Sequence, residues 1–198
     1  MTTSSGARPG GRRPLVTALL VLAAAAVLSA GTLLGIRWAA SHGTKATGTS
    51  ASRTGFFKLD RPASAIDLPA LSGKGTVSVA ALAGQPIVVN FWSSTCYPCQ
   101  KETPALASVA RVVGSKVRFV GIDSVDLRSA AARFVTRYKV PYPIAFDPKG
   151  TVAGQYRLVG LPVTVFLSRS GKTMLGENIG ALTAPKLRAI LHRLYGVT

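Results

Sequence analysis

The feature that most constrains this chain is a pair of cysteines, Cys96 and Cys99, which are the only two in 198 residues. An apolar, β-branched run at 86–92 precedes them and predicts a buried strand. Apolar residues at helical spacing follow them from Leu106 onward. We therefore expect the pair at the junction between a strand and a helix.

A helix start favours the reactive form of a thiol. Its unpaired N–H groups and the positive end of its dipole stabilise an anion, and the thiolate is the nucleophile in disulfide exchange. We therefore expect Cys96 to attack a disulfide. Cys99, one turn into the helix and more shielded, would resolve the mixed disulfide.

Two structural roles compete with this interpretation. An inert disulfide staple is disfavoured, because so small a ring removes little conformational entropy from the unfolded chain. Half of a zinc site is disfavoured, because the chain has no other cysteine and because His42 and His192 lie far away in sequence. We expect neither a metal nor a cofactor.

A longer motif surrounds the cysteines. Asn90-Phe91-Trp92 leads into Cys-x-Pro-Cys, and Glu102 and Pro104 follow. In this order the residues resemble the TlpA/ResA-type, thioredoxin-like proteins outside the cytoplasm. The resemblance implies a thiol–disulfide oxidoreductase that acts on exported proteins with cysteines or disulfides. Apocytochrome c, with its haem-site cysteines, is a substrate class that it implies.

The resemblance extends from 65 to 196 and implies an α/β thioredoxin fold, with a mixed sheet of four to five strands flanked by helices. Residues 59–84 resemble the N-terminal extension of the family. Residues 160–164 resemble the loop whose cis-proline faces the cysteines. The segment before this loop is longer than a minimal thioredoxin needs and matches the family's central αβ insertion.

The resemblance also implies a partner-binding surface. Pro162 is expected to be cis, although a turn proline is the simpler interpretation because only about 5–6% of X–Pro bonds are cis. The backbone of Leu161 would hydrogen-bond an extended partner segment. Trp92 and Tyr97 belong to this expected surface, together with Thr95. Thr95 stands where the family commonly has tryptophan, which predicts a smaller and more polar rim.

Glu102 follows Cys99 by three residues. The resemblance implies a buried carboxylate that tunes proton transfer at the cysteines, whereas position alone also fits a carboxylate that favours the helix dipole. The central-strand carboxylate of ordinary thioredoxins is absent, because Asn90 occupies that place. Glu102 is therefore the candidate proton acceptor.

The start of the chain predicts a membrane anchor. Residues 15–36 carry no charge and can span a hydrocarbon core of about 30 Å. The arginines before them favour a cytoplasmic basic tail at 1–14 and a single-pass protein whose C-terminal domain lies outside the cytoplasm. A cleaved signal peptide is the alternative, although its apolar core usually runs about 7–15 residues. Residues 37–58 predict a flexible tether to a thioredoxin-like domain at 59–198.

The charge balance is strongly basic, with 24 Lys and Arg against 7 Asp and Glu and a formal net charge of +17. Charge alone would fit a nucleic-acid partner. However, the basic residues are scattered singly and no nucleic-acid motif appears. We therefore expect a solvated basic surface near an anionic membrane or envelope polymer, and no nucleic acid.

Within the domain, local patterns predict the remaining elements. Turn residues around Gly73 predict a short hairpin, and a second apolar strand is expected to lie parallel to the first because a helix joins them. Amphipathic spacing predicts two further helices. The predicted segments are a hairpin near 72–79, a strand at 117–123, a helix at 127–138, a strand at 143–148, strands at 163–167 and 173–175, and a helix at 183–194 that Thr183 caps.

Four functions compete. The leading one is a membrane-anchored reductant of exported proteins, and Pro98 favours reduction over oxidation. Because no glutathione or NADPH motif is present, we expect a membrane electron carrier to re-reduce it. The same residues can instead oxidise exported thiols. A thiol peroxidase requires Pro-x-x-x-Thr-x-x-Cys, which Ser93 and Thr95 do not supply. A copper-binding assembly factor would use paired thiolates for Cu(I), but neither histidine is well placed.

Overall fold

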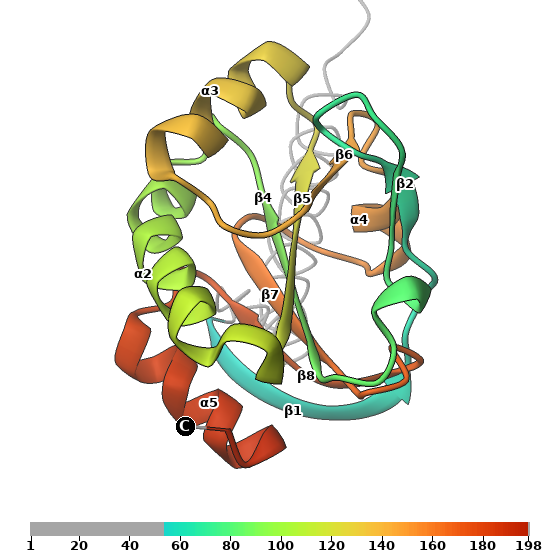
Figure 1. Ribbon diagram of the computed structural model, residues 1–198, viewed down its shortest axis with the longest axis vertical. Coiled ribbons are helices and arrows are strands. Elements are labelled where there is room, and N and C mark those ends of the chain that lie inside the picture. The colour runs from blue at the N-terminus through green and yellow to red at the C-terminus, as the bar shows by residue number, and fades with distance from the viewer. Residues whose placement is uncertain (1–53, 198) are drawn as a thin grey trace, which may run out of the picture. The chain divides into compact units, whose positions relative to one another are not determined.

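The computed structural model describes residues 54–197, which form a six-stranded mixed sheet with helices on both faces (Figure 1). The strand order is β1-β8-β7-β4-β5-β6, and β2 and β3 form a separate two-stranded sheet. The strands are β1 (Gly55–Pro62), β2 (Asp67–Pro69), β3 (Thr76–Ser78), β4 (Ile87–Trp92), β5 (Arg118–Ser124), β6 (Ile144–Asp147), β7 (Val163–Leu167) and β8 (Thr173–Ile179). The helices are α2 (Tyr97–Val113), α3 (Arg128–Tyr138), α4 (Thr151–Gln155) and α5 (Ala184–Tyr195), with short 3-10 turns at Ala80–Leu82 and Gly114–Lys116.

Strand β4 is the centre of the sheet. All six of its residues are buried, because β4 pairs in parallel with β5 and antiparallel with β7 and is covered on both faces. Val88 packs in the cluster under α2 and α5, while Val89 and Phe91 pack on the opposite face with Val152 and Tyr156. The continuous apolar run that predicted this strand reflects this two-sided burial.

Different elements pack on the two faces of the six-stranded sheet. Helices α2, α3 and α5 lie on one side of the sheet, and α4 lies on the other together with the β2–β3 hairpin (Figure 1). The predicted thioredoxin fold is confirmed. Helix α3 and strand β6 occupy the place of the predicted central insertion, where β6 forms the sheet edge parallel to β5.

One strand lies where the sequence predicted a tether. Strand β1 begins at Gly55 and pairs antiparallel with β8, so the predicted boundary at 58/59 is wrong by four residues and the sheet has six strands, not four to five. The Phe56 ring meets Phe166 edge-on at 5.8 Å between centroids. Gly176 leaves room for it, because a Cβ there would come within 2.7 Å of the Phe56 ring.

The predicted basic tail at 1–14 and anchor at 15–36 lie outside the described residues, as does the tether up to residue 53. Between residues 54 and 197, the helices are all too short or too polar to cross a bilayer.

Candidate functional site

The two cysteines lie at the start of α2 and form a disulfide. Cys96 is the N-cap residue, with extended backbone angles, and its Sγ accepts a hydrogen bond from the Cys99 backbone N–H at 3.2 Å. Pro98 fits the first turn of the helix, where a backbone donor is not needed. Cys96 is partly exposed and Cys99 is fully buried. The pair therefore leaves one cysteine accessible to solvent and shields the other.

Residues 93–95 form a tight turn between β4 and Cys96. The Cys96 backbone N–H donates to the Ser93 carbonyl at 3.1 Å, and the Ser93 and Thr95 hydroxyls lie 3.1 Å apart. The Gln100 side chain closes the turn by donating to the Ser94 carbonyl at 3.0 Å. Thr95 is exposed beside Cys96, so a small hydroxyl forms the rim at this position.

Glu102 lies one turn after Cys99 on α2 and is buried, with 1% of its surface exposed. Its carboxylate accepts one hydrogen bond from the Asn90 side chain at 2.8 Å and one from the Leu182 backbone N–H at 2.9 Å. Burial raises the pKa of Glu102 to about 7, and these two hydrogen bonds only partly offset that increase. Its two hydrogen-bond donors lie on β4 and just before α5. The Glu102 carboxylate therefore does not accept hydrogen bonds from the N-terminal amides of α2.

The expected cis-proline loop lies against the same cluster. The Leu161–Pro162 peptide bond is cis, as the resemblance implies, and the Pro162 carbonyl accepts a hydrogen bond from Gly180. Leu161 and Cys96 both pack as partly exposed neighbours of the buried cluster that includes Trp92. The fold thus brings together residues more than sixty positions apart in the chain.

Trp92 differs from its expected place. Its side chain is 2% exposed and stacks on Phe134 of α3, with 4.3 Å between ring centroids. The indole therefore supports the cluster below the cysteines and does not face a partner, which corrects its assignment to the partner-binding surface. Tyr97 is exposed on α2, where the Lys101 ammonium lies 4.5 Å from its ring centroid.

Two acids near the turn were missed by sequence reasoning. Asp126 accepts a hydrogen bond from the Ser94 backbone N–H at 2.6 Å. Asp123, at the end of β5, is fully buried, and no described group donates to either of its oxygens. Burial, together with the neighbouring Asp126 carboxylate, raises the pKa of Asp123 to about 8, and Arg128 only partly offsets this increase. Burial also raises the pKa of Asp126, but hydrogen bonds from Ser94 and Leu127 outweigh it and the net pKa is lowered.

A signal for these acids exists in the sequence. Parallel strands end at the same edge of a sheet, and the register pairs Trp92 of β4 with Asp123 of β5. Residues that follow β5 are thus placed beside the turn that follows β4. The position of an acid after the second predicted strand was therefore informative.

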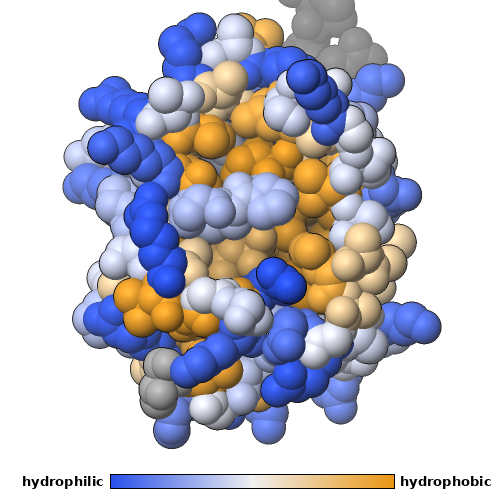
Figure 2. Space-filling view, in the orientation of Figure 1, coloured by the Kyte–Doolittle hydropathy of each residue, from blue (hydrophilic) through white to orange (hydrophobic). Residues whose placement is uncertain are grey.

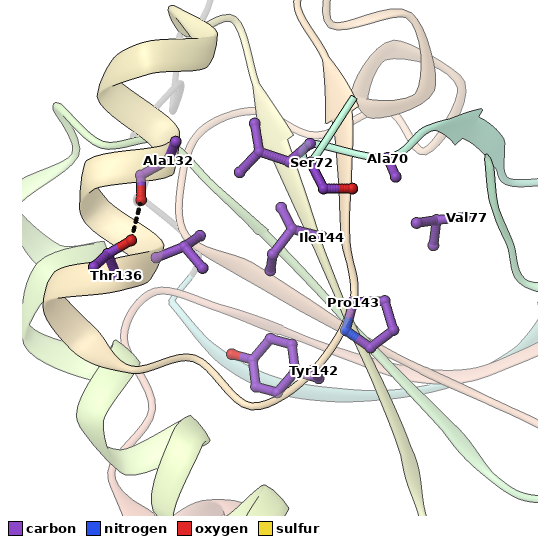
Figure 3. Close-up of a pocket in the computed structure, with 10 residues that line it drawn as sticks. Ala70, Ser72, Val77, Ala132, Thr136, Tyr142, Pro143 and Ile144 are labelled. Carbon is purple, nitrogen blue, oxygen red and sulfur yellow. Dashed lines mark hydrogen bonds between the residues drawn. The ribbon is translucent and has the colours of Figure 1, made fainter. Parts of the chain in front are cut away.

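Two hollows lie on either side of α3. An apolar one of about 390 Å³ lies between α3 and the β2–β3 hairpin, with Tyr142, Pro143 and Ile144 at its base and the Thr136–Ala132 hydrogen bond on its α3 side (Figure 3). Figure 2 shows this apolar surface at the centre of the face. None of its lining residues was a predicted site residue. The second hollow reaches the active-site turn, with Ser94 and Gln100 in its wall.

The described residues hold no group of three or more metal-ligating side chains. Both cysteines are engaged with each other, and His192 lies exposed on α5. The arrangement is a disulfide at the start of α2, with the buried Glu102 carboxyl group one turn further along the same helix.

Comparisons with known proteins agree with this geometry. The model of the AhpC/TSA family matches residues 59–174. The thiol-disulfide oxidoreductase ResA of Bacillus cereus (strain ZK / E33L) is 28% identical over 125 residues, which cover 63% of this chain and 71% of the relative.

Two solved structures are also similar. A secreted Mycobacterium tuberculosis disulfide oxidoreductase, homologous to E. coli DsbE, is 29% identical with a TM-score of 0.59, covering 65% of this chain and 96% of its own. A DsbF homologue from Corynebacterium diphtheriae is 26% identical with a TM-score of 0.65, covering 74% and 96%.

The raised pKa of Glu102 predicts a pH-dependent stability. A carboxyl group whose pKa rises from 4.5 in the unfolded chain to about 7 in the folded one stabilises the fold below pH 4.5, and this stabilisation is lost as the pH rises to about 7. Glu102→Gln should remove that loss, which amounts to about 3 kcal/mol. The measurement is urea unfolding of the oxidised protein across this pH range.

The Glu102→Gln side chain has one acceptor oxygen and so keeps only one of the hydrogen bonds from Asn90 and Leu182, so a constant offset of about 1 kcal/mol is expected and only the slope is diagnostic. Glu177→Gln, at a partly exposed carboxylate of β8, is the control and should follow the wild-type curve. Parallel curves for Glu102→Gln and the wild type would contradict the burial of a titrating carboxylate.

Proposed function

Because the chain belongs to the AhpC/TSA family and has a thioredoxin fold, we propose that it reduces disulfides in exported proteins through the Cys96–Cys99 dithiol. It is a thiol–disulfide oxidoreductase, as its relatives are named. The observation that carries the proposal is the asymmetry of the pair, with a partly exposed sulfur at the helix start and a buried one behind it.

The proposed reaction proceeds in two exchanges. The Cys96 thiolate attacks one sulfur of the substrate disulfide, that bond breaks, and the other substrate sulfur leaves as a thiolate that takes up a proton. Cys99, after losing its proton, then attacks Cys96 Sγ and releases the second substrate sulfur. The substrate gains two electrons and two protons, and the chain is left with the Cys96–Cys99 disulfide that the structure holds.

Glu102 is proposed as the proton acceptor for Cys99. It lies one turn further along α2, and its pKa of about 7 suits a group that exchanges protons near neutral pH. Asn90 holds the carboxylate in place and is itself bound to Thr164 of β7, which immediately follows the cis-proline loop. This chain of hydrogen bonds connects the proposed proton acceptor to the strand that follows the cis-proline loop.

Exposed apolar side chains support a protein substrate. Tyr97, Val125, Leu127 and Val159 account for four of the five large apolar side chains that are exposed in the described residues. They lie beside Cys96, around Asp126 and ahead of the cis-proline loop. Val125 also holds a φ of 54°, which a β-branched residue rarely adopts. Exposed apolar side chains of this kind suit contact with an extended chain that pairs with the backbone at Leu161.

The location is part of the proposal. One solved relative is described as secreted, and an apolar segment at 15–36 with basic residues before it supports a membrane-anchored chain whose domain lies outside the cytoplasm. A membrane electron donor would then return two electrons to the disulfide. We expect the full chain to stay in the membrane fraction after an alkaline carbonate wash, and a variant that lacks residues 1–36 to be released. Release of the full chain by the wash would contradict the anchor.

Replacing either cysteine by serine should stop disulfide exchange at a different step. Cys96→Ser should abolish exchange with a disulfide-bonded protein, because the attacking sulfur is lost. Cys99→Ser should accumulate a mixed disulfide through Cys96, which mass spectrometry of the alkylated product detects. Turnover by both variants at equal rates would contradict the assigned roles of the two sulfurs.

A further inference from the structure

The second hollow beside α3 carries a charge pattern that the exchange chemistry does not use. It has a volume of about 430 Å³ and lies between the active-site turn and α3. Ser94 and Gln100 form one wall, and Arg133 and Arg137 stand on the other together with Phe134. Because Ser94 and Gln100 flank the cysteine pair on either side in sequence, the hollow shares its wall with the reactive site.

The two arginines are available to a partner. Arg133 and Arg137 lie one turn apart on α3, and both are exposed. In the described part of the chain the one ion pair is between Arg61 and Glu177, so neither arginine has an acidic partner. Arg137 lies with its guanidinium 5.8 Å from the centre of the Tyr138 ring, which leaves its hydrogen-bond donors free.

A third arginine on α3, Arg128, is held by contacts that Arg133 and Arg137 lack. Arg128, at the start of α3, donates to the Ala70 and Leu71 carbonyls and lies over Phe146. No acid occurs on α3. The one acid that touches the rim, Asp126, is already engaged by the Ser94 and Leu127 backbone N–H groups.

We propose that Arg133 and Arg137 form a docking groove for an acidic segment of the protein that exchanges disulfides with Cys96. This inference rests on the proposed function and names a property of its partner. Two carboxylates of the segment would bind the guanidinium groups while the cysteine next to them reaches Cys96 over the Ser94 turn. Charges placed in this way accelerate encounter and select between partners more than they add affinity.

The test uses the reduced full-length chain and two synthetic peptides. Each peptide has one cysteine in a mixed disulfide with mercaptoethanol, and they differ only in carrying glutamates or lysines beside the cysteine. The reaction yields the oxidised chain, the free peptide thiol and mercaptoethanol. Bis(mercaptoethanol) disulfide serves as a neutral substrate that cannot use the groove.

Arg133→Glu with Arg137→Glu should slow exchange with the acidic peptide by about tenfold, because two attractions become repulsions. Exchange with the lysine peptide should not slow, and the rate with the neutral disulfide should stay unchanged. The discrimination should largely disappear at about 1 M salt, where the screening length is about 3 Å. Anisotropy of a labelled acidic peptide that lacks cysteine should show the same loss of binding without any chemistry.

Arg188→Glu with Arg193→Glu is the matched control. These arginines are exposed on α5, where they line a separate hollow formed by residues of α5, and the change in net charge is identical. If both double variants slowed exchange with the acidic peptide equally, net charge alone would explain the effect and the proposed groove would be contradicted. If the Arg133→Glu, Arg137→Glu variant kept the wild-type peptide kinetics but lost binding to vesicles of anionic phospholipid, the docking groove would be overturned in favour of a lipid-facing surface. Failure of the wild type on the neutral disulfide would instead refute the proposed function, and the anisotropy measurement would still decide on the groove.

Discussion

The hydrogen bond from the Cys99 backbone N–H to Cys96 Sγ is the interaction on which the rest of the site depends. It exists because β4 ends at Trp92 and α2 begins directly after Cys96, so that a sulfur takes the place of the usual oxygen at the helix cap. A cap accepts hydrogen bonds from unpaired amides, and this favours a negative charge on the capping atom. The same geometry leaves Cys96 partly exposed and buries Cys99, and the different roles proposed for the two sulfurs rest on this difference.

Around this cap the structure places ionisable groups that burial holds partly neutral. Glu102 and Asp123 both have raised pKa values because each is removed from water, yet they differ in their partners. Glu102 is bound by Asn90 and Leu182, whereas Asp123 receives no hydrogen bond from the described residues and faces Asp126, Arg128 and Asp147. Such a concentration of shifted groups is typical of functional sites.

Much of this arrangement could be predicted from local sequence signals. The strand before Cys96, the turn and strands after Pro162 and the helix capped by Thr183 lie where the patterns placed them, because continuous apolar runs, turn residues and caps act over a few positions. The Thr183 hydroxyl accepts from the Lys186 backbone N–H at 3.4 Å, as its position predicted.

What escaped prediction depends on pairing between distant segments. Strand β1 exists because Phe56 fits over Gly176, which lies 120 residues later, and nothing near Gly55 signals that contact. The burial of Trp92 required knowledge that Phe134 of α3 covers it. The groove arginines were visible only as scattered basic residues, until the fold placed one turn of α3 beside Ser94.

The reduction potential of the Cys96–Cys99 pair in the full-length chain tests the central claim most directly. Equilibration with thiol–disulfide buffers of known potential measures it, and for this two-electron couple about 30 mV corresponds to a tenfold change in the equilibrium constant. A reductant of exported proteins requires a value near that of thioredoxin, about −270 mV. A value near that of DsbA, about −120 mV, would contradict the proposed direction and make the protein an oxidant of exported thiols.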